Sequence, residues 1–170
     1  MTTATITVRH AVRADAPRLR EIYNQAVAGR ISTCDLEPLP LTAVEAWFDG
    51  RDVTTRPVYA AVADGTVAGY LSVSDFWNDR PGYRTTADCG LYVGAEHQGR
   101  GVGGRLLRHF LGHARELGID TVVTSMFADN EASVRLFRKA GFTRVGLCPG
   151  VANLDGVRKD LALVQRTVDP

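Results

Sequence analysis

The feature that most constrains this chain is the glycine-rich stretch Gln98–Gly104, which reads Gln-Gly-Arg-Gly-Val-Gly-Gly. A strand-like apolar run, Leu91–Val93, precedes it, and an amphipathic helix pattern begins inside it and continues to Leu117. Glycine lets the backbone approach a phosphate closely, and a helix N-terminus adds unpaired N–H groups and positive potential. The sequence therefore predicts a strand–loop–helix unit that holds a phosphorylated cofactor.

Glycine spacing distinguishes between the known kinds of phosphate-binding loop. Gly99, Gly101 and Gly104 fit the dinucleotide fingerprint, and Asp120 lies 16 residues after Gly104, but the unit lies past mid-chain and the predicted strand 121–126 does not end on an acidic residue. A P-loop requires Gly-Lys-Ser/Thr, whereas Gly104 is followed by Arg105 and Leu106. A turn that only caps a helix stays open as an alternative.

Composition indicates a single domain, residues 1–170, with the 45% hydrophobic and 23% charged content of a soluble globular protein. A net charge of +1 gives no electrostatic reason to expect nucleic acid or a membrane as partner. The three cysteines are far apart and form no Cys-x-x-Cys pair, so we expect neither a disulfide framework nor a metal site. A cytoplasmic location is the expectation that fits.

Hydrophobic periodicity predicts the order of the elements. Strands are expected at residues 5–8, 57–63, 66–74, 85–93, 121–126, 142–147 and 161–167. Helices are expected after a cap at Asp15, after a Thr42-x-x-Glu45 capping box, from the glycine-rich loop to Leu117, and over residues 130–140. Hairpins come first and βαβ units later, which predicts an α/β fold with strands in mixed directions.

Two blocks resemble one known superfamily. Gln98-x-x-Gly101-x-Gly103 is similar to the pyrophosphate loop of the GNAT N-acetyltransferases, which bind acetyl-coenzyme A. About 30 residues later, Asn130–Phe142 resembles the second cofactor-side helix of that superfamily, Asn-x-x-Ser/Ala-x-x-Leu-Tyr-x-x-x-Gly-Phe. The resemblance implies a mixed, mostly antiparallel central sheet flanked by helices, with acetyl-coenzyme A as cosubstrate and no metal.

Further matches narrow the resemblance to the phosphinothricin acetyltransferase group, which includes methionine sulfoximine and methionine sulfone acetyltransferases. They run from about Val8 to Gly146 and are Ile22-Tyr23-Asn24, Glu37-Pro38, Trp47, Arg56-Pro57, Gly69-Tyr70, Trp77 and Gly82-Tyr83-Arg84-Thr85. This group implies acetyl transfer to the amino group of a small amino acid or analogue. It also implies a homodimer formed through the late strands.

The resemblance also implies which residues bind the cofactor. The backbone of the strand pairs with the pantetheine arm, and one of its N–H groups polarises the thioester carbonyl. The glycine-rich loop holds the pyrophosphate, with arginine as a source of charge. The implied residues are Leu91, Tyr92, Val93, Gln98, Gly99, Arg100, Gly101, Val102, Gly103, Gly104, Asn130 and Ser133.

The catalytic groups depart from the family pattern at two positions. Asp88 stands where the group carries a glutamate, and its shorter side chain, about 1 Å further back, favours a bridging water between base and amine. Phe137 replaces the tyrosine thought to protonate the coenzyme A thiolate, and phenylalanine has no proton to donate. Tyr92 or water is the alternative acid.

The residues expected to bind the acceptor amine also depart from the family pattern. Trp77 is followed by Asn78 where the family has a basic residue, so Arg80 and Arg84 become the candidates to hold a carboxylate or phosphinate. The segment 156–160 also lacks the family's aromatic residue, which disfavours phosphinothricin itself. The predicted acceptor-side residues are Trp77, Asn78, Arg80, Tyr83, Arg84, Asp88, Cys89 and Gly90.

Two rival functions remain at this level. One is a GNAT that acetylates a protein N-terminus or another amine. The other is a non-catalytic module that binds acyl-coenzyme A. Asp88 favours an enzyme because it supplies a base, whereas Phe137 favours the module.

Overall fold

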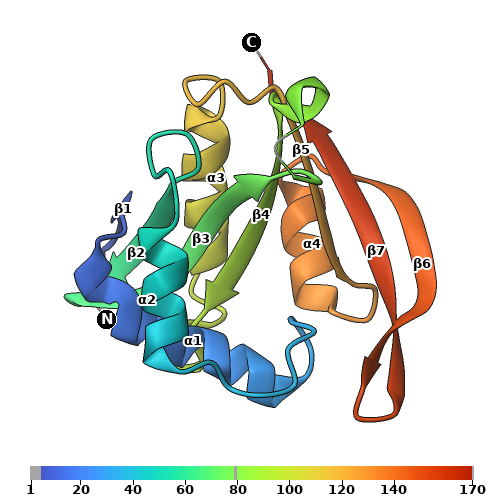
Figure 1. Cartoon of the computed structure of the whole chain (residues 1–170), viewed down its shortest axis with the longest axis horizontal. Helices are drawn as coiled ribbons and strands as arrows, with labels where there is room; N and C mark the ends of the chain where they lie inside the picture. The colour runs from blue at the N-terminus through green and yellow to red at the C-terminus, as the bar shows by residue number, and fades with distance from the viewer. Residues whose placement is uncertain (1–4, 79, 170) are drawn as a thin grey trace.

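The computed structural model describes residues 5–78 and 80–169, and its centre is a seven-stranded sheet in the order β1-β2-β3-β4-β5-β7-β6 (Figure 1). The pairing of β4 with β5 is parallel, and the other pairings are antiparallel, which confirms the expected mixed, mostly antiparallel sheet. The strands are β1 Ile6–His10, β2 Val58–Ala63, β3 Thr66–Asp75, β4 Thr86–Val93, β5 Thr121–Phe127, β6 Thr143–Leu154 and β7 Val157–Thr167.

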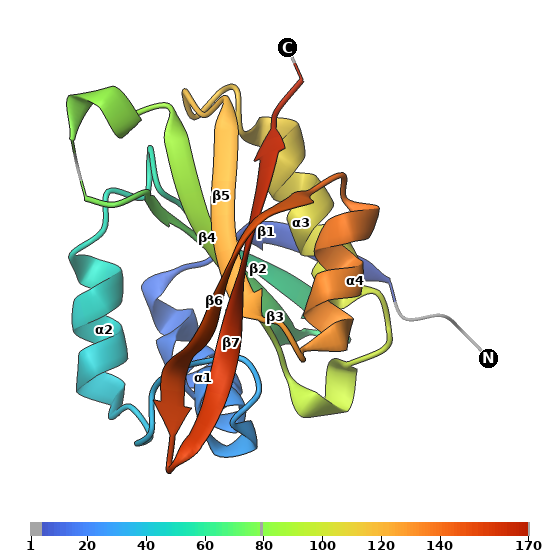
Figure 2. The ribbon, with the colours of Figure 1, turned by 90° about the vertical axis from the view of Figure 1, so that its right-hand side faces the viewer.

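Helices cover both faces of the sheet (Figures 1 and 2). One buried cluster joins α1 and α2 to the sheet, and a larger one joins α3 and α4 to the opposite face. The helices are α1 Ala16–Gly29, α2 Leu41–Asp49, α3 Val102–His113 and α4 Glu131–Lys139, with short 3-10 turns at Arg13–Asp15, Pro81–Tyr83 and Ala95–His97.

Strand alternation decides which side chains of β4 face which helices. Tyr92 pairs across the strands with Tyr70 and packs in the cluster under α1 and α2, whereas Leu91 pairs with Leu71 toward α3 and α4. Since successive side chains point to opposite faces, Asp88 lies on the same face as Tyr92. The two predicted catalytic side chains therefore share the α1–α2 face.

The parallel pair β4–β5 separates soon after it begins. Only Thr86 with Thr121, and Ala87 with Val122, are in register, and the two strands then diverge (Figure 1). From Asp88 onward β4 pairs with β3 on one side only. Its other edge is left open within the described residues, which is a place where an extended ligand can pair as an additional strand.

One predicted helix cap is wrong, and another is confirmed in position but not in its hydrogen bond. Helix α2 begins before Thr42, because the carbonyl of Pro40 already accepts the first N–H bonds and Pro40 is the N-cap. Asp15 does stand at the N-cap of α1, but its side chain makes no cap bond. Its carboxylate instead accepts the N–H of Val12 at 2.8 Å and forms an ion pair with Arg9 at 2.7 Å.

The last two strands are longer than predicted, and α3 is shorter. Strand β6 continues to Leu154 and β7 begins at Val157, so the two form a long hairpin. The pattern missed this extension because much of β6 is exposed and its pairing is irregular between Cys148 and Ala152. The helical bonds of α3 end at His113 and pass into turns before Leu117.

Candidate active site

A cleft of about 620 Å³ follows the gap between β4 and β5. Its walls come from both strands, the glycine-rich loop, α4 and the end of α1 with the loop after it. It brings together most of the predicted site residues: Cys89, Gly90, Leu91, Tyr92, Val93, Gln98, Gly99, Gly101, Val102, Gly103, Gly104, Asn130 and Ser133. Residues from β4 to α4 thus meet in one cavity.

The glycines of the loop have different physical roles. Gly99 and Gly101 have φ angles of 72° and 80°, and a Cβ at either would meet no atom within 4 Å. Gly103 has an ordinary φ, but its Cβ would lie 3.0 Å from Leu136 and 3.3 Å from Leu91. Gly99 and Gly101 therefore shape the loop, whereas Gly103 lets α3 pack closely against α4 and β4.

The loop presents the start of α3 to the cleft. Gly101 is the N-cap of the helix and has no side chain to occupy the first N–H groups. These groups have no intrahelical partner in any α-helix, and the helix dipole is positive there. Arg100 does not line the cleft, because its guanidinium contacts His97 at 3.1 Å and Asp64 at 3.6 Å. The anion-binding capacity lies in the backbone.

The predicted cofactor residues Asn130 and Ser133 lie together at the start of α4. The side-chain oxygen of Asn130 accepts the N–H of Ser133 at 3.2 Å, which caps the helix. The amide nitrogen of Asn130 donates to the carbonyl of Ile31 at 3.0 Å. Asn130 therefore ties α4 to the loop after α1, and both Asn130 and Ile31 line the cleft.

Asp88 lies outside the lining of the cleft but on the adjoining part of β4. Its carboxylate accepts the N–H of Cys89 at 2.6 Å. Burial raises the pKa of Asp88, and this effect exceeds the opposing hydrogen bonds from Thr124 and Cys89. A raised pKa makes the carboxylate a stronger base, as proton abstraction from an amine requires.

Tyr92 is packed between two other tyrosines. Its ring lies edge-on to Tyr23 at 5.0 Å between centroids and tilted against Tyr70 at 5.4 Å. Burial raises the pKa of Tyr92 well above its usual value, with smaller contributions from Tyr23, Asp35 and Asp88. The phenol therefore keeps its proton at neutral pH, and the raised pKa makes it a weaker acid than a free tyrosine.

Two further side chains of the cleft are chemically inert. Burial raises the pKa of Cys89, so this residue is a thiol and not a nucleophilic thiolate. Phe137 is buried against Phe142, with ring centroids 5.0 Å apart. The cleft thus has a hydrocarbon ring at the position where the resembled superfamily carries a tyrosine.

The predicted acceptor loop lies at the other end of β4. Asp75, just before this loop, pairs with Ala87, so the loop adjoins the Asp88 end of the strand. Phe76 stacks on Trp77 at 5.0 Å, and Tyr83 packs edge-on to both rings. Trp77 is nevertheless 69% exposed, which makes an open aromatic surface.

The backbone of this loop is strained. Trp77 and Asn78 have φ angles of 45° and 69°, a region that costs energy for residues other than glycine. The carbonyl of Arg84 accepts a bond from Arg56 at 3.1 Å, which ties the loop to the segment before β2. Arg80 is exposed. None of the predicted residues 77, 78, 80, 83 and 84 lines the cleft.

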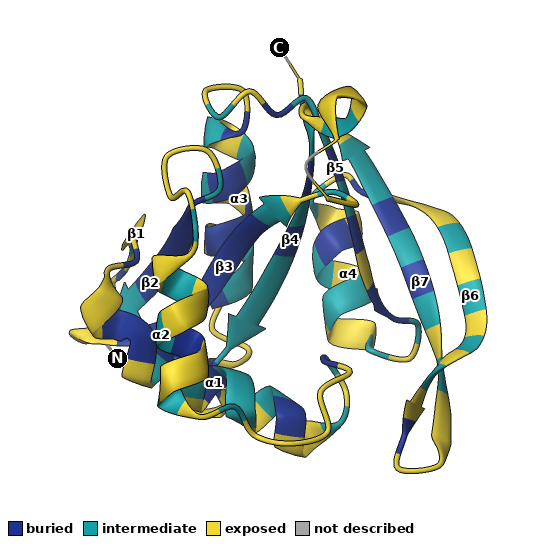
Figure 3. Cartoon of the chain, viewed as in Figure 1, coloured by how far each residue is buried: buried dark blue, intermediate teal, exposed yellow. Residues whose placement is uncertain are grey.

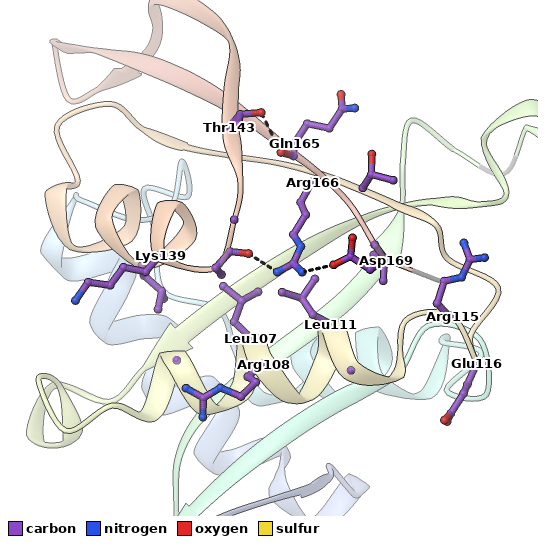
Figure 4. A pocket seen from close by; sticks show the side chains of 17 residues that line it. Leu107, Arg108, Leu111, Arg115, Glu116, Lys139, Thr143, Gln165, Arg166 and Asp169 are labelled. Carbon is purple, nitrogen blue, oxygen red and sulfur yellow. Dashed lines mark hydrogen bonds and ion pairs between the residues drawn. The ribbon is translucent and has the colours of Figure 1, made fainter.

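A second, larger cavity of about 1110 Å³ lies between α3, α4 and the end of β7 (Figure 4). It is rich in basic side chains, and Arg108, Arg115 and Lys139 line it. Arg166, at its centre, donates to the carbonyl of Ala140 and contacts Asp169 at 3.4 Å, so it closes the C-terminal end of α4. This cavity contains neither the base nor the open strand edge, and we assign the site to the smaller cleft.

Sequence patterns did not reveal the walls supplied by distant segments. Thr124, Ser125 and Met126 of β5, and Ile31 and Ser32 after α1, line the cleft. Their positions depend on how the strands separate and on where the loop after α1 returns. No local periodicity encodes either feature.

A parallel strand pair that separates beside a glycine-rich helix N-terminus offers an open strand edge next to an anion-binding backbone, which suits a phosphorylated carrier with an extended, amide-bearing arm. Residues 17–142 match the family model described as Acetyltransferase (GNAT) family. The chain therefore belongs to the GNAT family, and it is an acetyltransferase.

Relatives and solved structures agree with this assignment. The L-methionine sulfoximine/L-methionine sulfone acetyltransferase of Pseudomonas aeruginosa is 35% identical over 164 residues, which are 96% of this chain and 95% of the relative. The L-amino acid N-acyltransferase of Escherichia coli is 32% identical over the same shares. A phosphinothricin acetyltransferase structure from Sinorhizobium meliloti, in complex with acetyl-coenzyme A, has a TM-score of 0.90 at 28% identity and covers 98% of this chain and 89% of that one.

Residues 5–78 and 80–169 include no helix with the length and apolar character to cross a membrane. The same residues contain no group of three or more histidine, cysteine or acidic side chains placed to hold a metal ion.

Proposed function

We propose that this chain transfers the acetyl group of acetyl-coenzyme A to the amino group of a small amino acid or a close analogue, such as methionine sulfoximine or methionine sulfone. It does so as one domain, residues 1–170. The observation that carries the proposal is the continuity of β4. Its open edge and the glycine-rich loop adjoin a base, Asp88, and an acid, Tyr92, on one face of the same strand.

The cleft holds the donor through its backbone. The main chain of Leu91, Tyr92 and Val93 pairs with the pantetheine amides, and residues 98–104 take the pyrophosphate at the start of α3. Acetyl-coenzyme A supplies an acetyl group activated as a thioester. Asn130 and Ser133 act by fixing the wall opposite the strand.

The protein groups handle two protons. Asp88 removes a proton from the attacking amine, through a water because its side chain is short. A backbone N–H of β4 stabilises the oxyanion of the tetrahedral intermediate. Tyr92 or a water protonates the departing sulfur, because Phe137 has no proton to donate.

The acceptor binds on the face of Asp88. The aromatic surface around Trp77 and Tyr83 and the cations Arg80 and Arg84 lie at that end of β4, where they can take the carboxylate of an amino acid. Asn78 shapes the loop, and Cys89 and Gly90 form the floor.

A screen tests this function directly. Each candidate amine is mixed with acetyl-coenzyme A, and the free thiol that is released is measured. The candidates are amino acids, their sulfoximine and sulfone analogues, alkyl amines, and peptides with a free N-terminal amino group. The expected result is turnover with a small amino acid or analogue. Turnover only with peptides would show that the enzyme acetylates protein N-termini instead. Binding of acetyl-coenzyme A without turnover of any amine would show a non-catalytic binding module.

The same proposal includes a cytoplasmic homodimer. Val145, Leu147, Val151 and Val157 of the β6–β7 hairpin are between 41% and 59% exposed, and β6 is an edge strand (Figure 3). A second copy that covers this strip removes apolar surface from water and protects the edge. The free thiols of Cys34, Cys89 and Cys148 suit a reducing compartment.

Replacing Leu147 with Asp tests the dimer. A charge buried in the shared strip is costly, so the variant is expected to be monomeric at micromolar concentration while it stays folded. Light scattering measures the mass, and circular dichroism checks the fold. A wild-type mass of one chain would refute the dimer.

A further inference from the structure

The end of α2 carries an arginine that has no ion-pair partner among the described residues. Arg51 follows the C-cap residue of α2, and its Nη2 donates to the carbonyl of Val73 and, at 3.3 Å, to the hydroxyl of Ser74. Its guanidinium carbon lies 4.7 Å from the centroid of the Trp47 ring. Arg51 is thus held in one position between the end of β3 and an aromatic ring.

The guanidinium of Arg51 uses only part of its hydrogen-bonding capacity. The bonds to Val73 and Ser74 both come from Nη2. Nε is buried and has no hydrogen-bond partner, and Nη1 makes no hydrogen bond to a described residue. A guanidinium donates from all of its nitrogens in a planar fork that matches a carboxylate. The free N–H groups of Nη1 are therefore left for a ligand.

Arg51 lines a third cavity, of about 680 Å³, where β3 ends and β4 begins. Both carboxylates of this cavity are bound to other groups. Asp75 pairs with Arg56 at 2.7 Å, and Asp52 accepts the N–H of Thr54 at 3.0 Å and two threonine hydroxyls. A partly buried cation without a bound carboxylate is costly, so the cavity favours an incoming anion.

The cavity adjoins the end of β4 at which Asp88 lies. Ser74, which Arg51 contacts, is the cross-strand partner of Asp88. Val73 packs in the cluster toward α3 and α4, so strand alternation places Ser74 on the same face as Asp88. Side chains that are directly opposed on one face have Cβ atoms about 5 Å apart. Because an α-amino acid has its amine and carboxylate on one carbon, its amine can approach Asp88 through the proposed water while its carboxylate reaches Arg51.

We infer that Arg51 binds the carboxylate of the acceptor and thereby makes the enzyme select amino acids over amines without a neighbouring carboxylate. The inference rests on the proposed function, in which the acceptor is a small amino acid and Asp88 is the base. It moves the main contact to the end of α2, away from the arginines of the acceptor loop. Of those, Arg84 also lines the cavity, whereas Arg80 does not.

A carboxylate site beside the base separates different classes of amine. An amino acid presents its carboxylate to Arg51. A peptide N-terminus has an amide carbonyl in that place, and an alkyl amine has neither group. When the ligand offers no anion, the N–H groups of Arg51 lose their water without gaining a charged partner, which lowers affinity. Arg51 therefore accounts for the exclusion of peptides as well as for the choice of amino acids.

The test compares an amino acid that the wild type acetylates, beginning with L-methionine sulfone, with its α-amide. The ratio of their kcat/KM values is measured in the wild type and in Arg51→Met, so that the different basicity of the two amines cancels. Arg51→Met is expected to lower the preference for the acid about 10- to 100-fold, mainly through a higher KM, because one charge-assisted contact is lost. The KM for the amide and the affinity for acetyl-coenzyme A should not change, since Arg51 lies outside the cleft. Arg51→Lys, which keeps the charge and loses the planar fork, should restore part of the preference.

Arg13→Met is the matched control for a merely structural role. Arg13 donates to Asp49 at 3.1 Å, so it also ties α2 to a neighbouring segment, but it does not line the cavity. This variant should keep the preference of the wild type for the acid. An unchanged preference in Arg51→Met, an equal fall in kcat/KM for acid and amide, or a loss of preference only in Arg80→Met would overturn the inference.

A binding measurement on the wild type needs no turnover and does not depend on how Arg51→Met folds. N-acetyl-L-methionine sulfone has the carboxylate but no reactive amine. Its titration is expected to change the fluorescence of Trp47, on which Arg51 stacks, with Trp47→Phe as the blank. Its α-amide should give no such change. An equal response to acid and amide overturns the inference even if the enzyme acetylates amino acids. A wild type that responds to the acid alone but acetylates no amine overturns the proposed function instead.

Discussion

Replacing Gly101 with Ala separates the conformational role of the loop from its role in binding acetyl-coenzyme A. Gly101 has a φ of 80°, and an added Cβ would meet no protein atom within 4 Å. The stability cost is therefore backbone strain alone, roughly 1–2 kcal/mol for an L-residue in the left-handed region. In a domain of this size that lowers the melting temperature by roughly 2–8 °C.

The effect on binding has another cause. The methyl group would project into the open space at the start of α3, where the pyrophosphate is proposed to lie. Losing one charge-assisted hydrogen bond of about 1.5–3 kcal/mol weakens affinity roughly 10- to 100-fold. Calorimetric titration with acetyl-coenzyme A measures this loss of affinity.

Gly65→Ala is the matched control. Gly65 has a φ of 76° in the β2–β3 turn, and its Cβ would also meet nothing within 4 Å. Both variants should lose similar thermal stability, and only Gly101→Ala should lose affinity. Wild-type affinity in Gly101→Ala, or an equal loss in Gly65→Ala, would refute the assignment of the loop.

Two other substitutions test the site. Asp88→Asn should keep acetyl-coenzyme A affinity and lower turnover about 100-fold near pH 7, because the base is lost. Wild-type turnover should fall as the pH drops through the raised pKa of Asp88, since protonation removes the base. The variant should lack this pH dependence. Its turnover should approach that of the wild type at high pH, where the amine deprotonates unaided. Equal rates at pH 7 would exclude Asp88 as the base. Asn130→Ala should lose about 2 kcal/mol of stability, from one helix cap and one further bond, and should also weaken acetyl-coenzyme A binding. Asn24→Ala, which removes two comparable bonds to Leu39 away from the cleft, should cost stability alone; equal affinities of the two variants would show that Asn130 does not set the cleft wall.

Local sequence determined the parts of the site that depend on neighbouring residues. The glycines of residues 98–104 predicted a strand–loop–helix unit because only glycine readily adopts the φ angles that Gly99 and Gly101 show. Asn130 predicted the start of α4, where its side chain does cap the helix. Residues 57–74 predicted the β2–β3 hairpin, and the two residues at its turn have positive φ.

Local patterns failed where two signals competed or where exposure weakened the periodicity. The Thr42 capping box matched its motif, but Pro40 starts α2 earlier because its own carbonyl accepts the first bonds. The far half of the β6–β7 hairpin was missed, because exposed and irregularly paired residues carry little hydrophobic alternation.

Only the tertiary structure decided the shape of the cleft and the surroundings of its acid. The separation of β4 from β5 after Ala87, and the contact of Gly103 with Leu91 and Leu136, depend on packing between segments that the sequence keeps apart. The same is true of the packing of the Tyr23 ring against Tyr92. Periodicity and capping report on residues within a few positions of one another, whereas these contacts form only when the loop after α1 folds back against the central strand.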